Sequence, residues 1–91
     1  MPDNFYGTGR RKSSVARVTI TEGNGKFTFN GKDLEQYFPS PSMKMTIEKP
    51  FKVVSLEGKF DMVVNVNGSG LSAQSDAVAL GISRALIKMN P

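Results

Sequence analysis

Alternating apolar and polar residues predict two strands, at residues 15–21 and 60–66. The side chains expected to face a core are Ala16, Val18 and Ile20 in the first segment and Phe60, Met62, Val64 and Val66 in the second. A period of two with β-branched residues is typical of a strand that buries one face. If these faces cover a core, Arg17 points to solvent from the other face of the first strand.

A turn and a third, shorter strand follow the first one. The turn at residues 22–25 contains Asn-Gly, which supplies the positive φ angles that hairpin turns need. Phe27 and Phe29 then share one face of a strand at residues 26–30. We expect this strand to pair with the strand before the turn as a β-hairpin.

Capping residues and prolines predict two helices in the middle of the chain. Asp33 is placed to cap a short helix, and Ser40 followed by Pro41 is a favourable start for a longer one. Proline disfavours helical backbone before it, so we expect Pro50 to end the second helix. Residues 51–54 would then form a short strand.

A third helix is predicted from about residue 74 to residue 89. Its apolar stripe consists of Val78, Ile82, Leu86 and Met89. A stripe of small residues lies beside it, at Ala77, Gly81 and Ala85. The spacing is that of a helix, and the small residues allow close approach to a sheet. Ser72 or Ser75 is placed to cap its start. Strands interspersed with helices predict one domain over residues 1–91, with helices packed on one face of a sheet.

The chain contains neither cysteine nor histidine. These absences exclude disulfides, thiolate metal sites and the most common general base. No apolar run approaches the roughly 18 residues that span a membrane, and the N-terminus lacks the regions of a secretion signal. We therefore expect no enzyme activity, no metal or cofactor, and no membrane partner.

The net charge of +4, from 12 Lys and Arg against 8 Asp and Glu, is modest, but the cations are clustered. Residues 10–12 are consecutive cations in a basic, glycine-rich segment, residues 1–14, that leads into the first strand. Such cations neutralise phosphates, Gly7 and Gly9 would let a polymer backbone come close, and Ser13 adds a hydroxyl donor. The segment predicts contact with a nucleic acid; the alternative is an exposed basic arm without a partner.

A glycine-rich turn precedes the third helix. Residues 68–73, GSGLSA, have the spacing of a dinucleotide-binding loop. The chain after the loop is too short for the strand that carries a ribose-binding carboxylate, so a small nucleotide-binding protein is the weaker interpretation. Amides of the loop, with Gln74 beside them, are better suited to an RNA phosphate, and a plain turn with a helix cap is the remaining alternative.

Several sequence blocks resemble those of one family. Residues 6–18, YGTGRRKSSVARV, are similar to the N-terminal signature of the ninth small-subunit ribosomal protein in its bacterial or organellar form. Further blocks that match in family order are Gly23-Asn24-Gly25-Lys26, Leu34-Glu35-Gln36-Tyr37-Phe38, Gly68-Ser69-Gly70 with Gln74, and Gly81-Ile82-Ser83-Arg84-Ala85-Leu86. One departure is Ala73, where the family usually has a third glycine.

The resemblance implies a fold and a role. The fold is a two-layer α/β (α+β) domain with helices on one face of a mixed β-sheet and a left-handed βαβ crossover, of the ribosomal protein S5 domain 2-like type. The role is architectural: backbone-phosphate contacts to 3′ major domain rRNA in the head of the small subunit, beside neighbouring head proteins. The ribosome could be cytoplasmic or organellar. A non-ribosomal RNA-binding module of the same fold is the alternative.

The residues expected to contact RNA follow from the charge pattern and the resemblance together. They are Tyr6, Gly7, Thr8, Gly9, Arg10, Arg11, Lys12, Ser13, Arg17, Gly68, Ser69, Gly70, Gln74 and Arg84. The resemblance also implies a basic C-terminal extension that reaches transfer RNA in the peptidyl site. The sequence ends at Pro91 before any such extension, so we expect no residue present to contact transfer RNA.

Overall fold

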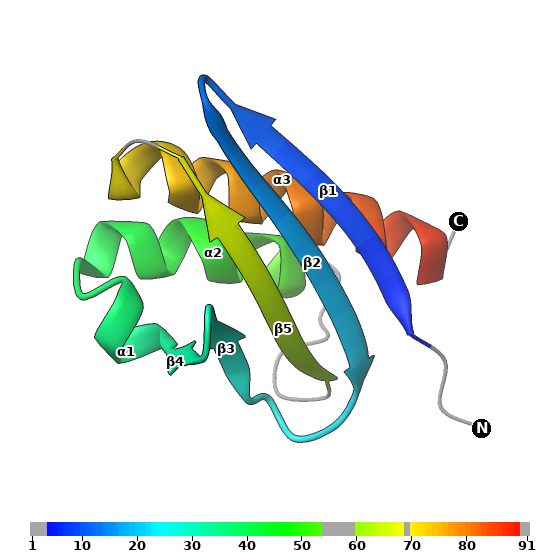
Figure 1. The fold of residues 1–91 in the computed structure, drawn as a ribbon. Coiled ribbons are helices and arrows are strands. Elements are labelled where there is room, and N and C mark those ends of the chain that lie inside the picture. Colours follow the sequence, from blue (N-terminus) through cyan, green and yellow to red (C-terminus); the bar gives the residue numbers. More distant parts are fainter. Residues whose placement is uncertain (1–3, 54–59, 69, 90–91) are drawn as a thin grey trace.

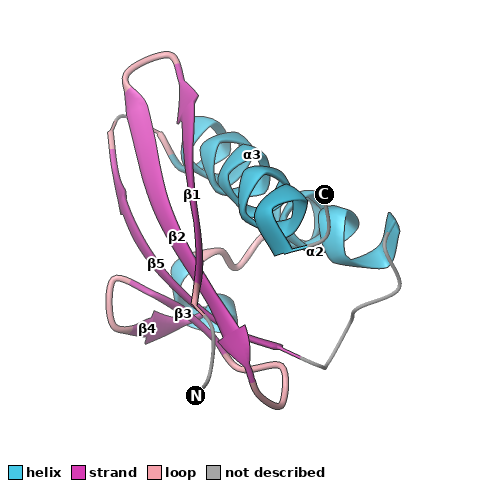
Figure 2. Cartoon of the chain, turned by 90° about the vertical axis from the view of Figure 1, so that its right-hand side faces the viewer, coloured by secondary structure: helices cyan, strands magenta, loops and turns pink. Residues whose placement is uncertain are grey.

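The computed structural model describes residues 4–53, 60–68 and 70–89, and these form two layers (Figure 1). The strands are β1 (Phe5–Arg11), β2 (Ser14–Glu22), β3 (Phe27–Phe29), β4 (Lys32–Asp33) and β5 (Phe60–Asn67), and the helices are α1 (Leu34–Tyr37), α2 (Pro41–Val53) and α3 (Leu71–Met89). Figure 2 shows the sheet edge-on, with α2 and α3 on one side of it. We call the opposite, uncovered side of β1, β2 and β5 the open face.

The sheet is mixed, with the strand order β1-β2-β5-β3-β4. Its pairs are antiparallel except that of β3 with β5, which is parallel. The connection from β3 to β5 runs through α2 behind the sheet, and β5 lies to the right of β3 in the view of Figure 1. This arrangement makes the crossover left-handed, so the two-layer fold implied by the resemblance is confirmed.

The predicted pairing of residues 15–21 with residues 26–30 is wrong, because β5 lies between them. β5 pairs with β2 from Val15↔Asn67 to Glu22↔Phe60 and takes up the edge that a hairpin would have used. The partner of β2 on its other edge is β1, a strand that the sequence pattern did not predict.

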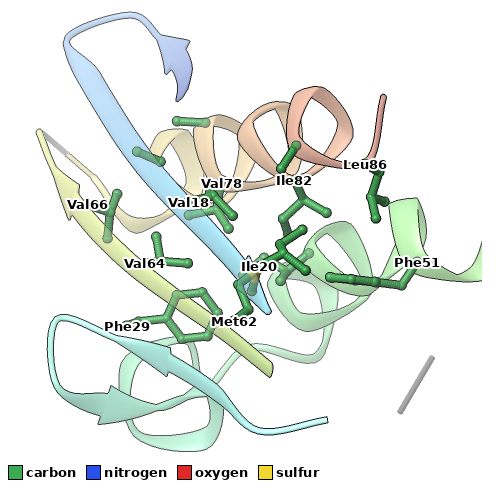
Figure 3. Close-up of a cluster of buried hydrophobic side chains, with 14 of the residues drawn as sticks. Val18, Ile20, Phe29, Phe51, Met62, Val64, Val66, Val78, Ile82 and Leu86 are labelled. Atoms are coloured by element: carbon green, nitrogen blue, oxygen red, sulfur yellow. The ribbon is translucent and has the colours of Figure 1, made fainter. Parts of the chain in front are cut away.

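The core lies between the covered face of the sheet and the helices (Figure 3). Its buried apolar residues are Ala16, Val18, Ile20, Phe29, Phe38, Ile47, Phe51, Met62, Val64, Val66, Ala77, Val78, Ile82, Ala85 and Leu86. The core-facing positions predicted for both strands are therefore confirmed, with Phe60 half-buried at the margin. The predicted stripe of the third helix is confirmed through Leu86, and the side chain of Met89 lies outside the described residues.

Two predicted helix boundaries are wrong. Pro50 lies inside α2, and the residues expected to begin a strand after it continue the helix to Val53, while residue 54 lies outside the described residues. α3 begins at Leu71, so Ser72 and Ser75 are helical residues rather than caps, and the Ser75 hydroxyl donates to the Ser72 carbonyl at 2.7 Å.

The other helix starts are confirmed. The Asp33 carboxylate accepts from the backbone N–H of Gln36 at 2.9 Å, and the Gln36 side chain accepts in return from the Asp33 N–H, which completes a capping box. α2 starts at Pro41, and its first turn closes with a bond from Lys44 N–H to the Ser40 carbonyl.

Candidate nucleic-acid interface

The basic segment forms the tip of a tight hairpin. Arg11 pairs with Ser14, which leaves only Lys12 and Ser13 to join β1 to β2. Lys12 has a φ of 55°, in the left-handed region that non-glycine residues seldom adopt. Both turn residues are exposed. The cations predicted to meet phosphates are thus held on ordered backbone.

Strand alternation sends the neighbouring arginines to opposite sides of the sheet. Arg10 and Arg17 are exposed on the open face, because their neighbours of the other parity pack toward the helices. Arg11 lies on the helix side, where its Nε is 3.8 Å from Oδ2 of Asp76 in α3. The Arg11 and Asp76 side chains are 61% and 46% exposed, so this ion pair contributes little to stability.

The glycine-rich turn packs directly against the hairpin. A Cβ on Gly68 would lie 2.4 Å from Cα of Ser14, and Gly68 has a φ of +126°. The hairpin tip, the end of β5 and the start of α3 lie together at the upper end of the molecule in Figures 1 and 2. Two segments predicted independently to meet phosphates, although distant in sequence, therefore share one surface.

Gly70 has the environment expected of a ligand-facing glycine. Its φ is +80°, and no described atom lies within 4 Å of where a Cβ would stand. It is exposed, as is Gly68. Ser69, which was also predicted to contact RNA, lies outside the described residues.

Gln74 does not face solvent, contrary to the prediction that it lies beside an RNA backbone. Its side chain is 7% exposed, and its Nε2 donates to the Gly68 carbonyl at 2.8 Å. Its Oε1 accepts from the Tyr37 hydroxyl at 2.8 Å, and that hydroxyl also accepts from the Asn30 side chain at 3.3 Å. Gln74 therefore holds the glycine loop in place from inside the protein.

Gly7 and Gly9 are also buried, so the close approach that they permit is to α3 and not to a ligand. A Cβ on Gly9 would lie 1.8 Å from the Ala77 carbonyl oxygen, and one on Gly7 would lie 2.1 Å from the Gly81 carbonyl oxygen. The small-residue stripe of the third helix is thus confirmed as a packing surface, with β1 as its partner.

The remaining predicted residues are exposed. Tyr6 and Thr8 lie on the open face, and the Tyr6 side chain is 55% exposed. Arg84 lies on α3 and donates from Nη1 to the Thr8 carbonyl at 2.7 Å. Arg84 therefore fastens α3 to the outer strand, whatever else it contacts.

The open face carries a hollow that sequence reasoning missed. It has a volume of about 240 Å³ and is lined by Arg10, Val15, Arg17, Asn65 and Asn67. Across the strands, Val15 pairs with both Arg10 and Asn67, and Arg17 pairs with Asn65. The available signal was the pair of asparagines at alternate positions of β5, because asparagine is depleted in strands and needs a reason to be there.

The carboxylate nearest to this hollow along β5, that of Asp61, is engaged in hydrogen bonds to the backbone. Asp61 stands on the same face as Asn65, four residues away, which is roughly 13 Å along a strand. It accepts hydrogen bonds from the backbone N–H groups of Lys26 and Asn24, at 3.0 Å each, and these bonds lower the pKa of its carboxyl. The charge at the hollow is therefore set by the two arginines.

The described residues offer neither a cluster of metal ligands nor a membrane-spanning helix. No group of three or more His, Cys, Asp or Glu side chains among them could hold a metal ion. None of the helices in the described part of the chain combines the length and the apolar character needed to cross a bilayer.

The sequence matches a known protein family. The sequence model of the family described as ribosomal protein S9/S16 matches residues 9–91. The match contains the cationic hairpin tip, the glycine loop and all of α3, so it spans the surface described above as well as the core. The resemblance seen in the sequence is confirmed: the chain belongs to the ribosomal protein S9/S16 family and is a small-subunit ribosomal protein.

Proposed function

We propose that this protein binds the 3′ major domain of small-subunit rRNA, in the head of the subunit, through contacts to backbone phosphates. The contacts come from one surface, which we call the hairpin-end surface and which consists of Arg10, Lys12, Ser13, Arg17, Gly68 and Gly70. Its role is architectural, as membership of a ribosomal protein family implies. Neighbouring ribosomal proteins in the head are the other expected partners.

The observation that carries the proposal is the packing of Gly68 on Ser14. This contact places exposed loop glycines beside a hairpin whose cations stand on paired strands, at Arg10 and Arg17, or on the tight turn between them, at Lys12. When a cation on a strand meets a phosphate, only its side chain has to be ordered, whereas a cation on a mobile arm also loses backbone freedom. Convergence of the two segments is therefore what a phosphate-binding surface requires.

The cations of this surface are available to bind a partner. Among the described residues, no ion pair or hydrogen bond engages the side chains of Arg10, Lys12 and Arg17, whereas Lys44 and Lys52 are paired with glutamates. Cations without an internal partner retain their full attraction for RNA phosphates. Each phosphate they neutralise releases condensed counterions and steepens the salt dependence of binding.

The test compares the wild-type chain with two double variants. Binding to 3′ major domain RNA and to an unrelated RNA of equal length is measured by filter binding or fluorescence anisotropy over a salt series. Arg10→Ala with Arg17→Ala removes two cations of the hairpin-end surface, and Lys49→Ala with Lys88→Ala removes two exposed cations from the helix side.

We expect the wild type to prefer the 3′ major domain RNA near physiological salt. The arginine variant should weaken binding and reduce the log–log salt slope by about 1.4 to 1.8, from roughly 0.7 to 0.9 per phosphate contact. The lysine variant should change neither. Equal effects of the two variants, or no preference between the RNAs, would contradict the proposal.

A further inference from the structure

The hollow on the open face has an apolar floor and polar walls. Val15 is shorter than the side chains around it, so it forms the floor between Arg10 on β1 and Asn67 on β5. Arg17 and Asn65 form the next row along the same strands. Neighbouring strands are about 4.8 Å apart, so these groups stand around a space of roughly two strand spacings.

The walls offer hydrogen bonds that the protein does not use. Within the described residues, no hydrogen bond or ion pair engages the side chains of Arg10, Arg17, Asn65 or Asn67, although other polar side chains on the protein are paired. Each carboxamide supplies one acceptor and two donor hydrogens, and each guanidinium supplies donors only. The hollow can therefore bond a group that is itself both donor and acceptor, next to an anion.

Size limits the occupant. Pockets for drug-sized molecules have volumes of about 300–1,000 Å³, whereas this hollow has about 240 Å³. A single planar ring system fits these dimensions better than a larger ligand. A bare phosphate would use the guanidinium groups but would leave the apolar floor and both carboxamide acceptors without a role.

We propose that the hollow seats one unstacked nucleotide of the bound RNA. The base lies over Val15 with its edge bonded by Asn65 and Asn67, and the adjoining phosphates pair with Arg10 and Arg17. This inference rests on the proposed function, since it names what one part of the RNA-binding surface recognises. Bases inside an RNA helix do not expose a face to a protein, so the nucleotide comes from a loop, a bulge or a junction.

The arginines and the asparagines contribute differently to RNA binding. Guanidinium groups bind phosphate irrespective of base, so Arg10 and Arg17 contribute affinity and salt dependence. Carboxamides bond base edges, so Asn65 and Asn67 contribute preference among bases. Because both asparagines are exposed and bond to no other described residue, their replacement should leave the fold unchanged.

The test uses short single-stranded oligoribonucleotides and measures base preference separately from electrostatic binding. The probes are homopolymeric strands of each base and a strand of equal length and charge in which the central nucleotides are abasic. The proteins are the wild type, the double variant Asn65→Ala with Asn67→Ala, and the control Val63→Ala, which changes an exposed side chain elsewhere on β5. Thermal melts establish that all three are folded.

We expect the wild type and the Val63 control to discriminate among the homopolymers by about five-fold or more and to bind the abasic strand at least about five-fold more weakly. The asparagine variant should bind all strands within two-fold of one another while keeping the wild-type salt slope. Equal binding of abasic and normal strands by the wild type, or discrimination that survives in the asparagine variant, would overturn the proposal.

Two further outcomes separate this proposal from its neighbours. Tight binding of a free mononucleotide in the absence of RNA would make the hollow a small-ligand site and would also overturn the inference. If base preference is absent while preference for 3′ major domain RNA and its salt slope persist, the hollow does not bind a nucleotide as proposed, but the proposed function stands. Loss of preference for that RNA would instead contradict the proposed function itself.

Discussion

Three glycines decide how close the two layers of this protein come. Gly7 and Gly9 of β1 meet the backbone of α3, and Gly81 of α3 meets β1 and the side chain of Val18. A Cβ on Gly81 would lie 2.8 Å from Cγ2 of Val18. Because the nearest atoms to Gly7 and Gly9 are backbone atoms, no rotamer change can make room for a side chain there.

Replacing Gly9 with alanine should therefore destabilise the protein. The methyl group would stand 1.8 Å from the Ala77 carbonyl oxygen and must push β1 away from α3. We expect the free energy of unfolding to fall by about 1–3 kcal/mol or more, as for other overpacked sites. Urea denaturation measures the change. Thr8→Ala, on the exposed side of the same strand, should stay within about 0.5 kcal/mol of wild type; a similar loss in both variants would show that the backbone contact is unimportant.

Asp61 gives the protein a specific response to acid. Hydrogen bonds from the N–H groups of Lys26 and Asn24 lower the pKa of its carboxyl in the folded state. A carboxyl whose folded pKa lies below its unfolded value of about 3.9 stabilises the fold above that value, and the stabilisation disappears as pH falls through the folded pKa. Asp61→Asn should accordingly flatten the fall in melting temperature below about pH 4. Melting curves between pH 2 and pH 7 test this; parallel curves for wild type and variant would argue against it.

At the scale of elements, the strands and helices with their own apolar period were predictable, and those held by other contacts were not. β2, β5 and α3 show their periods in sequence because each buries a row of apolar side chains. β1 was missed because two of its helix-facing positions are glycines, so its buried side carries no apolar signal. The false hairpin had a related cause: a turn sequence shows that the chain bends but not which strand fills the neighbouring edge.

Local rules also misjudged α2. Proline usually ends a helix because it lacks an N–H and crowds the preceding turn. Here the helix continues past Pro50 because Phe51, the next residue, is buried in the core and stacks on Phe27 with ring centroids 5.2 Å apart. Burial of a phenylalanine contributes about as much as the proline costs. A sequence alone does not show which of the two effects is larger.

The junction of β5 and α3 depends on one buried side chain. Gln74 joins the Gly68 carbonyl to the Tyr37 hydroxyl, and so it connects the glycine loop to α1. Gln74→Ala would leave the Gly68 carbonyl and the Tyr37 hydroxyl without these part-buried bonds, and we expect a loss of about 1–3 kcal/mol. Ser72→Ala, at an exposed position in the first turn of α3, should have a small effect.

Chemical denaturation of the two variants supplies the comparison. We also expect Gln74→Ala to weaken RNA binding, because the loop that contains Gly68 and Gly70 would lose its support. A variant that is destabilised but binds RNA as wild type does would show that the loop needs no such support, and a variant as stable as wild type would show that the hydrogen bonds contribute nothing.

At the scale of the whole molecule, the helices and the proposed RNA-binding surface lie on opposite faces of the sheet. The helices cover one face of the sheet (Figure 2), and the cations of the hairpin-end surface lie on the other face and at the hairpin tip. If that division holds in the complex, RNA should perturb amide resonances of β1, β2, β5 and residues 68–70 and leave the outer side of α2 unchanged. Heteronuclear NMR titration of the chain with 3′ major domain RNA tests this. Shifts concentrated on α2 would place the interface on the wrong side of the protein.

The candidate site was partly predictable at this scale. The cationic segment and the glycine loop were found in sequence because each has a local chemical signature, and Arg17 was placed on the solvent side by alternation. Their meeting could not be foreseen, because it depends on the packing of Gly68 on Ser14. The asparagines of β5 were missed for the same reason: their meaning comes from the strand beside them. Gln74 was wrongly predicted to be exposed, because a polar residue beside a glycine loop looks accessible until its hydrogen-bond partners are known.

The contact between the first strand and the last helix has a consequence for synthesis. Gly7 and Gly9 give β1 little apolar surface of its own, and both are buried against the backbone of α3, so β1 is covered only once α3 has formed. At about 5–20 residues per second, the ribosome needs roughly 3–13 seconds to proceed from the end of β2 to the end of α3. We expect protease resistance of the nascent chain to rise sharply only after residues 71–89 have emerged, and a gradual rise would count against this order. Until then the cationic hairpin is accessible on an unfolded chain. The time that translation takes, rather than the stability of the finished domain, therefore sets how long the hairpin is exposed to RNAs other than the one it binds in the ribosome.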